Sequence, residues 1–133
     1  METDSTTRKA IDARENARVR LAQGTLAVVF TITGAMKLAL PMENLTELMT
    51  WPGSVAEPLV RAIGIAELAG AIGLVVPMLS GIRPGLASYA AFGLMALMIG
   101  ALGYHLMLFQ GIMLVPTLLL GLLAAYVGVR RMR

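Results

Sequence analysis

Four long apolar segments dominate the chain, and shorter polar segments separate them. The apolar segments cover residues 21–40, 62–79, 86–109 and 112–129. A helix that crosses a bilayer needs about 20 predominantly apolar residues at a rise of about 1.5 Å per residue, so each segment is long enough for one crossing. The pattern therefore predicts an all-α integral membrane protein, a bundle of four transmembrane helices.

The third and fourth segments follow each other with almost no polar break. Within residues 84–129 only His105 can carry a charge. This stretch corresponds to about 69 Å of helix, enough for two crossings and too long for one. We place the turn at Gln110 and Gly111. Pro116 then falls in the first turns of the last helix, where a proline removes few hydrogen bonds.

Three polar segments border the apolar ones. Residues 1–20 form a basic N-terminal extension, residues 41–61 a loop that contains three glutamates, and residues 130–133 a basic tail. Within the loop, the helical spacing of Leu45, Leu48 and Met49 predicts a short interfacial helix.

The positions of the cations predict the orientation of the bundle. Lys and Arg are retained in short cytoplasmic segments, and they are concentrated here in the two terminal segments, with Arg83 between the second and third helices. We therefore expect both termini to be cytoplasmic and the 41–61 loop to be outside. The alanine-, glycine- and arginine-rich composition is typical of bacteria, which predicts a multi-pass protein of the bacterial cytoplasmic (inner) membrane.

The composition supports a membrane protein and excludes several functions. Hydrophobic residues make up 57% of the chain and charged residues 14%, whereas an ordinary soluble domain has about 45–50% and about 25%. Because so apolar a chain belongs in a membrane, its net charge of +3 does not indicate nucleic-acid binding. The chain has no cysteine and one histidine, which excludes disulfides, thiolate metal sites, iron–sulfur clusters and a bis-histidine haem within one copy. No metal site is predicted.

Three ionisable residues lie inside the predicted helices, at similar depths. With the N-terminus inside, Lys37 lies about 5 Å, Glu67 about 9 Å and His105 about 6 Å below the outer ends of their helices. Ionisable groups within a membrane are costly and need a partner, a water path or an interfacial position. Lys37, Glu67 and His105 are therefore our candidates for ligand binding or a proton relay.

Side-chain direction predicts that Lys37 and Glu67 form an ion pair. Side chains lean toward the N-terminus of their own helix, so on antiparallel helices these two lean toward each other. Gly34 and Gly64 lie one turn before them, and Gly70 continues a small-residue pattern that permits close approach of helices. The alternative is a structural role, in which the pair only fixes the helix register and His105 is a neutral interfacial residue.

Two motifs resemble the DoxX-like family of small four-helix membrane proteins. They are Phe30-x-x-x-Gly34-x-x-Lys37-Leu38 in the first helix and Gly64-Ile-Ala-Glu67-Leu-Ala-Gly70, followed by Leu74 and Pro77, in the second. The histidine near the end of the third helix also fits, and the resemblance covers roughly residues 21–129. It implies an association with quinone-linked oxidoreductases, as for the family's founding members, but implies no catalytic residues.

Two functions follow, and the sequence favours a non-catalytic protein over an enzyme because no nucleophile with a neighbouring base is visible. The first is an accessory or anchoring subunit of a membrane oxidoreductase complex, in contact with its subunits and the lipid bilayer. The alternative is a binder or transporter of a quinone, an anion or a proton. No covalently bound cofactor is expected. A quinone could lie near Met95, Met98 and Tyr104. The spacing of small residues is also compatible with a homo-oligomer.

Overall fold

The computed structural model describes residues 2–133, except for the side chains of Glu2 and Pro84. The elements in chain order are α1 (Glu2–Ala39), α2 (Met42–Met49), the 3₁₀ turn η1 (Trp51–Ser54), α3 (Glu57–Ser80), α4 (Pro84–Met107) and α5 (Gly111–Met132). The described residues contain no strand. The chain is therefore all-α, as predicted.

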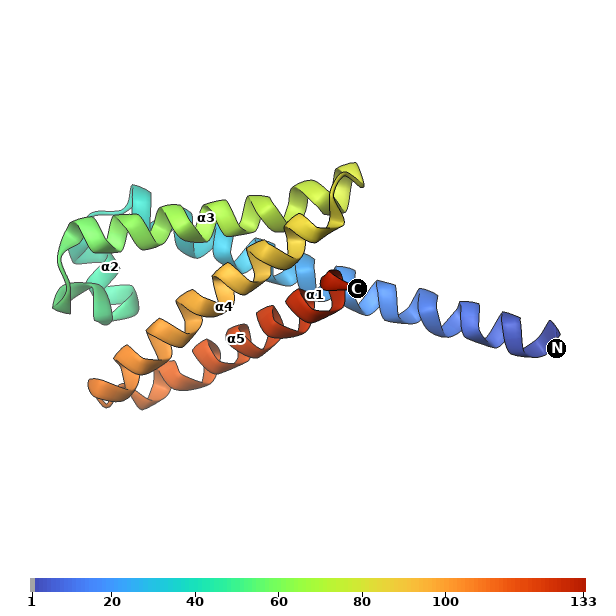
Figure 1. Cartoon of the computed structure of the whole chain (residues 1–133). Helices are drawn as coiled ribbons and strands as arrows, with labels where there is room; N and C mark the ends of the chain where they lie inside the picture. The colour runs from blue at the N-terminus through green and yellow to red at the C-terminus, as the bar shows by residue number, and fades with distance from the viewer. Residues whose placement is uncertain (1) are drawn as a thin grey trace.

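Four of the helices, α1, α3, α4 and α5, are long and apolar enough to cross a membrane. They run alternately up and down (Figure 1), so the C-terminus and the α3–α4 loop lie at one end of the bundle, which we call the terminal end. The short helix α2 and the α4–α5 turn lie at the opposite end, which we call the α2 end. The short loops at each end enforce this antiparallel order.

The first helix is much longer than the others. It has 38 residues, which correspond to about 57 Å. Its first half projects from the terminal end away from the other helices (Figure 1). The basic extension and the first apolar segment are thus one continuous helix. The sequence around their junction contains no proline, and Gly24 is the weakest helix former there.

The four long helices are arranged as two pairs. α1 packs along α3, and α4 packs along α5. The two pairs meet near the terminal end and diverge toward the α2 end (Figure 1). The buried apolar core lies where the pairs meet, and its largest fully buried side chains are Leu26, Phe30, Leu74, Leu94 and Val127.

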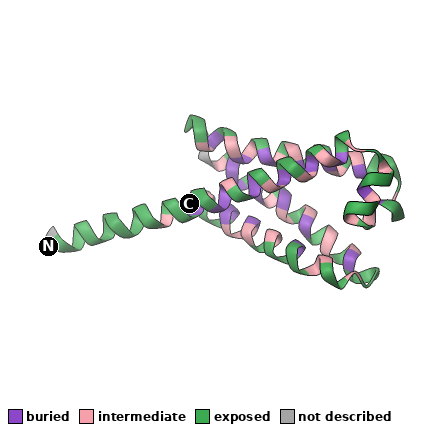
Figure 2. Cartoon of the chain, turned by 180° about the vertical axis from the view of Figure 1, so that it is seen from behind, coloured by how far each residue is buried: buried purple, intermediate pink, exposed green. Residues whose placement is uncertain are grey.

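The outward faces of the helices are apolar as well. Figure 2 shows buried residues only along the inner faces, with exposed residues covering the outside. Many of the exposed side chains are large and apolar, among them Ile65, Ile72, Ile99, Leu119 and Leu122. A soluble protein rarely exposes such a continuous apolar surface, whereas lipid tails cover it without penalty.

The helix ends differ slightly from the sequence-based boundaries. α3 begins at Glu57, earlier than expected, because Pro58 occupies a first-turn position that favours helix initiation. Arg61 therefore belongs to α3 and not to the preceding loop. Gly81 ends this helix with a φ of 68°, a conformation that glycine adopts most readily. The last turn lies just before the predicted position, with Phe109 at a φ of 54°.

Candidate functional site

Two glycines bring α1 and α3 into close contact at the site. A Cβ atom built on Gly34 would lie 2.9 Å from the backbone oxygen of Gly64, and one built on Gly64 would lie 2.8 Å from Cβ of Lys37. Real Cβ atoms do not approach other atoms so closely, so any larger residue would push the helices apart. The close approach predicted for these two glycines is confirmed, and it sets the distance across which the polar residues interact.

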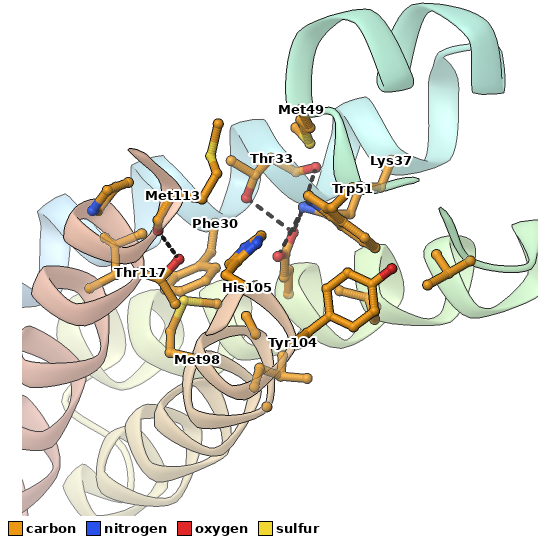
Figure 3. Close-up of a pocket in the computed structure, with 18 of the residues that line it drawn as sticks. Phe30, Thr33, Lys37, Met49, Trp51, Met98, Tyr104, His105, Met113 and Thr117 are labelled. Atoms are coloured by element: carbon orange, nitrogen blue, oxygen red, sulfur yellow. Dashed lines mark hydrogen bonds and ion pairs between the residues drawn. The ribbon is translucent and has the colours of Figure 1, made fainter. Parts of the chain in front are cut away.

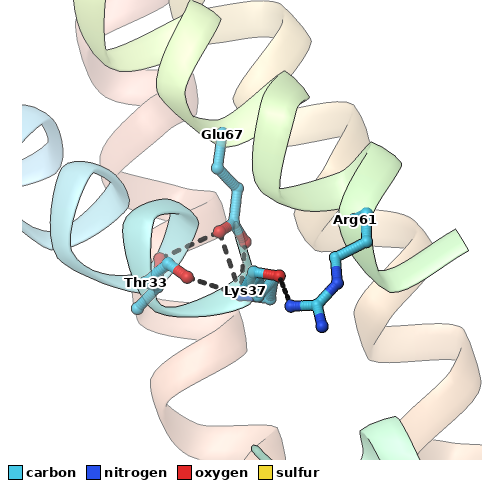
Figure 4. Close-up of polar contacts among 4 residues, drawn as sticks. All are labelled: Thr33, Lys37, Arg61 and Glu67. Carbon is cyan, nitrogen blue, oxygen red and sulfur yellow. Dashed lines mark hydrogen bonds and ion pairs between the residues drawn. The ribbon is translucent and has the colours of Figure 1, made fainter. Parts of the chain in front are cut away.

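Lys37 and Glu67 form a buried ion pair between these helices (Figure 4). Nζ of Lys37 lies 3.0 Å from Oε1 and 2.9 Å from Oε2 of Glu67. Both side chains are only 5% exposed. The hydroxyl of Thr33 donates a third hydrogen bond, of 3.0 Å, to Oε2. The predicted ion pair is thus confirmed, with Thr33 as a further partner.

The charges of this ion pair are already balanced within the protein. Nζ also lies 3.5 Å from the backbone oxygen of Thr33, so all three ammonium hydrogens have an acceptor nearby. The ring of Trp51 lies 5.8 Å from Nζ, within the range of a cation–π interaction. An incoming anion would have to compete with Glu67 for Lys37, so the pair is poorly suited to hold an external anion.

Arg61 closes the end of α1 next to the ion pair. Its Nη1 donates hydrogen bonds of 2.5 and 2.8 Å to the backbone oxygens of Lys37 and Leu40. The last carbonyl groups of a helix lack partners within it, so the guanidinium satisfies two of them. Glu57, one turn earlier on α3, holds the same guanidinium at 2.7 Å. Arg61 therefore fixes the position of the helix segment that carries Lys37.

A cavity of about 460 Å³ lies beside the ion pair, between the two diverging helix pairs. Figure 3 shows side chains from α1, η1, α4 and α5 around it. Most of its wall is apolar and includes Phe30, Ile63, Leu97 and Met98. A size of about 300–1,000 Å³ and a mainly apolar wall with a few polar groups are typical of small-molecule sites. We call this space the central cavity.

The polar groups of the central cavity come from several of the elements around it. Lys37 and Glu67 line one side, and Tyr104 and His105 on α4 line another. The ring of Trp51 packs edge-to-face on Tyr104, with ring centroids 6.4 Å apart. Three residues predicted to lie at one depth, Lys37, Glu67 and His105, therefore share one cavity.

The hydrogen bond of His105 indicates which of its ring nitrogens carries the hydrogen. Its Nδ1 lies 2.8 Å from the side-chain oxygen of Gln110, at the α4–α5 turn. With that oxygen as the acceptor, Nδ1 carries the hydrogen and Nε2 is left as an acceptor. Among the described residues, the hydroxyl of Tyr104 and the indole N–H of Trp51 have no hydrogen-bond partner. The residues that line the cavity thus include hydrogen-bonding groups that are not used within the protein.

Some sequence-based expectations for this region differ from the structure. Of the three residues named as a possible quinone surface, Met98 and Tyr104 line the central cavity, whereas Met95 packs against the apolar core. Gly70 is a close-approach position toward α4, because a Cβ there would lie 2.5 Å from the side chain of Leu94. Gly100, by contrast, lines the central cavity, and a Cβ atom there would meet no atom within 4 Å.

Three residues of the site, Thr33, Trp51 and Arg61, were not predicted from the sequence. The roles of Trp51 and Arg61 depend on long-range contacts between the 41–61 loop, α1 and α3. The local spacing of residues in the sequence does not reveal such contacts. Thr33 lies one turn before Lys37, and this spacing could have identified it as a second partner of Glu67. Among the described residues no group of three or more metal-ligating side chains occurs.

The fold and the cavity define the chain as an all-helical membrane protein with four apolar spans. An ion pair joins its first and second spans beside an apolar cavity. Residues 21–127 match the DoxX-like family, and the chain belongs to this family. Comparisons with curated proteins and with solved structures gave no match.

Proposed function

We propose that this DoxX-like membrane protein binds a neutral lipophilic molecule with a carbonyl- or hydroxyl-bearing headgroup, such as a quinone, in the central cavity. One observation carries the proposal: a mainly apolar cavity of about 460 Å³ whose free polar groups are hydrogen-bonding groups without a net charge. Lys37 and Glu67 neutralise each other, so a neutral ligand fits better than an anion. The hydroxyl of Tyr104 and the indole N–H of Trp51 can donate to a carbonyl oxygen.

Trp51 provides a direct way to measure binding. It is the single tryptophan of the chain, and it lines the cavity. Quinone rings quench tryptophan fluorescence at short range, so a short-chain ubiquinone titrated into the purified protein should quench Trp51 in a saturable manner. Weak, linear quenching identical to that of free tryptophan would contradict the proposal.

A matched pair of variants tests the role of the cavity. Tyr104→Phe removes one hydroxyl and should weaken quinone binding by up to about tenfold, because a hydrogen bond contributes about 0.5–1.5 kcal/mol. Tyr89→Phe is the control: Tyr89 lies on the same helix, is 78% exposed and does not line the cavity. Equal affinities of the two variants would remove Tyr104 from the site.

A second candidate is the accessory or anchoring role in a quinone-linked membrane oxidoreductase complex. The lack of cysteine and the single histidine support it, because this chain has few residues that could hold a redox centre of its own. A partner would then supply the electron transfer. Purification of the tagged native protein in a mild detergent, followed by mass spectrometry, should recover a stoichiometric redox protein. A lone oligomer that retains a lipophilic ligand would favour the binding function alone.

A further inference from the structure

A second cavity, of about 320 Å³, lies at the terminal end of the bundle, far from the central cavity. Its wall combines residues of α1, α3, the α3–α4 loop, α4 and α5, and we call it the terminal pocket. Arg20 and Arg131 are its only charged lining residues in the part of the chain that the structure describes. Its wall therefore has an excess of positive charge, in contrast to the balanced central cavity.

The position of Arg131 is fixed by a buried glutamine. Gln23 is 1% exposed, and its side-chain oxygen accepts a hydrogen bond of 2.8 Å from Nε of Arg131. The side-chain nitrogen of Gln23 donates to the backbone oxygen of Leu74 at 2.5 Å. Gln23 thereby ties α1, α3 and α5 together. Only Nε of Arg131 is used in this contact, so both terminal nitrogens remain free to donate hydrogen bonds.

The carboxylate of Glu15, next to the lining residue Asn16, is not paired with either arginine of the pocket. Glu15 forms its ion pair with Arg130, the neighbour of Arg131. Among the described residues, the side chain of Arg20 has no ion pair or hydrogen bond. Two arginines, one held in place and one free, thus share a cavity in which no acidic side chain is present.

The rest of the pocket wall is partly polar and partly apolar. Asn16 and Gln23 of α1 contribute polar side chains, whereas Pro77 and Met78 of α3 and Ala87 of α4 contribute apolar ones. The pocket lies where the apolar spans end, which is the depth of lipid headgroups in a bilayer. A ligand with an anionic group next to an apolar part matches both walls, and guanidinium groups bind phosphate through paired N–H donors.

We propose that the terminal pocket binds the phosphate of an anionic phospholipid headgroup, with Arg20 and Arg131 as the phosphate ligands. The glycerol and the first acyl carbons lie against Pro77, Met78 and Ala87. The bound lipid joins α1 to α5 at the terminal end, where Gln23 already connects them. A free phosphate ion shares the same chemistry, and the experiment below separates the two sources.

The test is native mass spectrometry of the full chain, delipidated in a mild detergent and titrated with phosphatidylglycerol, phosphatidylcholine or inorganic phosphate. We expect one tightly bound phosphatidylglycerol per chain and clearly weaker retention of phosphatidylcholine. Equal retention of the two lipids would overturn the proposal. Retention of inorganic phosphate, with displacement of the lipid by it, would assign the site to a soluble anion and overturn the lipid assignment.

Two variants with the same change of charge locate the site. Arg20→Gln should lower the affinity for phosphatidylglycerol about fivefold, as expected for one arginine near a lipid phosphate. Because the Arg20 side chain has no partner among the described residues, this variant should fold normally. Arg18→Gln is the control, since Arg18 is exposed on the same helix outside the pocket. Equal losses in both variants would indicate diffuse surface attraction and overturn the proposal.

A third variant tests the apolar wall without changing any charge. Met78→Trp fills part of the pocket and should also weaken phosphatidylglycerol binding, with both arginines intact. A thermal unfolding midpoint measured in parallel shows that the variant is folded. Unchanged lipid binding in a folded Met78→Trp protein would place the lipid outside the terminal pocket.

Discussion

At the scale of single residues, the ion pair between Lys37 and Glu67 forms one wall of the central cavity. The pair is buried between α1 and α3, and Thr33 supplies an additional hydrogen bond to the carboxylate. Removing two charges from water is costly, and their mutual attraction offsets the cost only while both are present. The pair therefore fixes how α1 and α3 are aligned, while the hydrogen-bonding groups of Trp51, Tyr104 and His105 also line the cavity.

Replacing one partner of this pair should destabilise the protein strongly. We expect Lys37→Met to lower the free energy of unfolding by about 3–5 kcal/mol, because it leaves the carboxylate of Glu67 buried and unpaired. The double variant Lys37→Met with Glu67→Leu removes both charges and should recover most of the loss. Thermal unfolding in detergent measures both values. A double variant as unstable as the single one would show that the charges stabilise the bundle beyond neutralising each other.

At the scale of helices, the contact of α1 with α3 depends on two residues without side chains. Gly34 and Gly64 let the backbones approach, and Arg61 then reaches from α3 to the final carbonyl groups of α1. Each helix thus completes the other: α1 supplies Lys37, and α3 supplies both Glu67 and the cap. A small increase in the helix separation would weaken all of these contacts together.

Alanine at position 34 should separate the two helices. The new methyl group would lie 2.9 Å from the backbone oxygen of Gly64, which cannot move independently of its helix. Overpacking lowers the free energy of unfolding by about 1–3 kcal/mol, and the better helix propensity of alanine offsets at most about 1 kcal/mol of this loss. We therefore expect Gly34→Ala to lower the free energy of unfolding by up to about 2 kcal/mol, measured by thermal unfolding in detergent.

Gly24 provides the control for this substitution on the same helix. A Cβ atom at Gly24 would meet no atom within 4 Å, so Gly24→Ala should leave the stability unchanged or raise it slightly. If both variants had the same unfolding midpoint, the close approach at Gly34 would not limit the packing of α1 on α3.

Hydrophobic patterning was sufficient to predict the four membrane-spanning segments, because the part of each helix that lies in lipid must be apolar throughout. The depth and direction of Lys37 and Glu67 were sufficient to predict their pairing, since both lie on regular antiparallel helices. Trp51 and Arg61 could not be assigned in this way. Their roles depend on how the 41–61 loop folds back over the bundle and on where α3 begins, and neither follows from a periodic pattern.

At the scale of the whole molecule, the two helix pairs meet at the terminal end and diverge at the α2 end (Figure 1). The central cavity occupies the space where they diverge. Leu45 of α2 and Pro52 of η1 are fully buried, which anchors the loop that covers this end. A ligand of the central cavity would therefore contact the long helices and also the loop at the α2 end.

The orientation of this molecule in the membrane is a prediction that the lack of cysteine makes easy to test. Because the chain has no native thiol, each single-cysteine variant reports on one position. With both termini cytoplasmic, a membrane-impermeant maleimide added to intact bacterial cells should label Ser54→Cys in η1 and should spare Ala10→Cys in α1 until the cells are lysed. The opposite labelling pattern would show that the bundle is inserted with its termini outside.

The length of α1 also determines where its N-terminal charges are held. The helix has 19 residues, 2–20, before the first apolar segment, so an upright extension reaches about 28 Å from the membrane boundary. The Debye length at physiological ionic strength is only about 8 Å. Arg18 and Arg20 thus lie within the electrostatic field of the lipid surface, whereas Arg8 and Lys9 are held beyond it by a rigid spacer. The tip of α1 can therefore meet a soluble partner whose own charges are screened from the membrane.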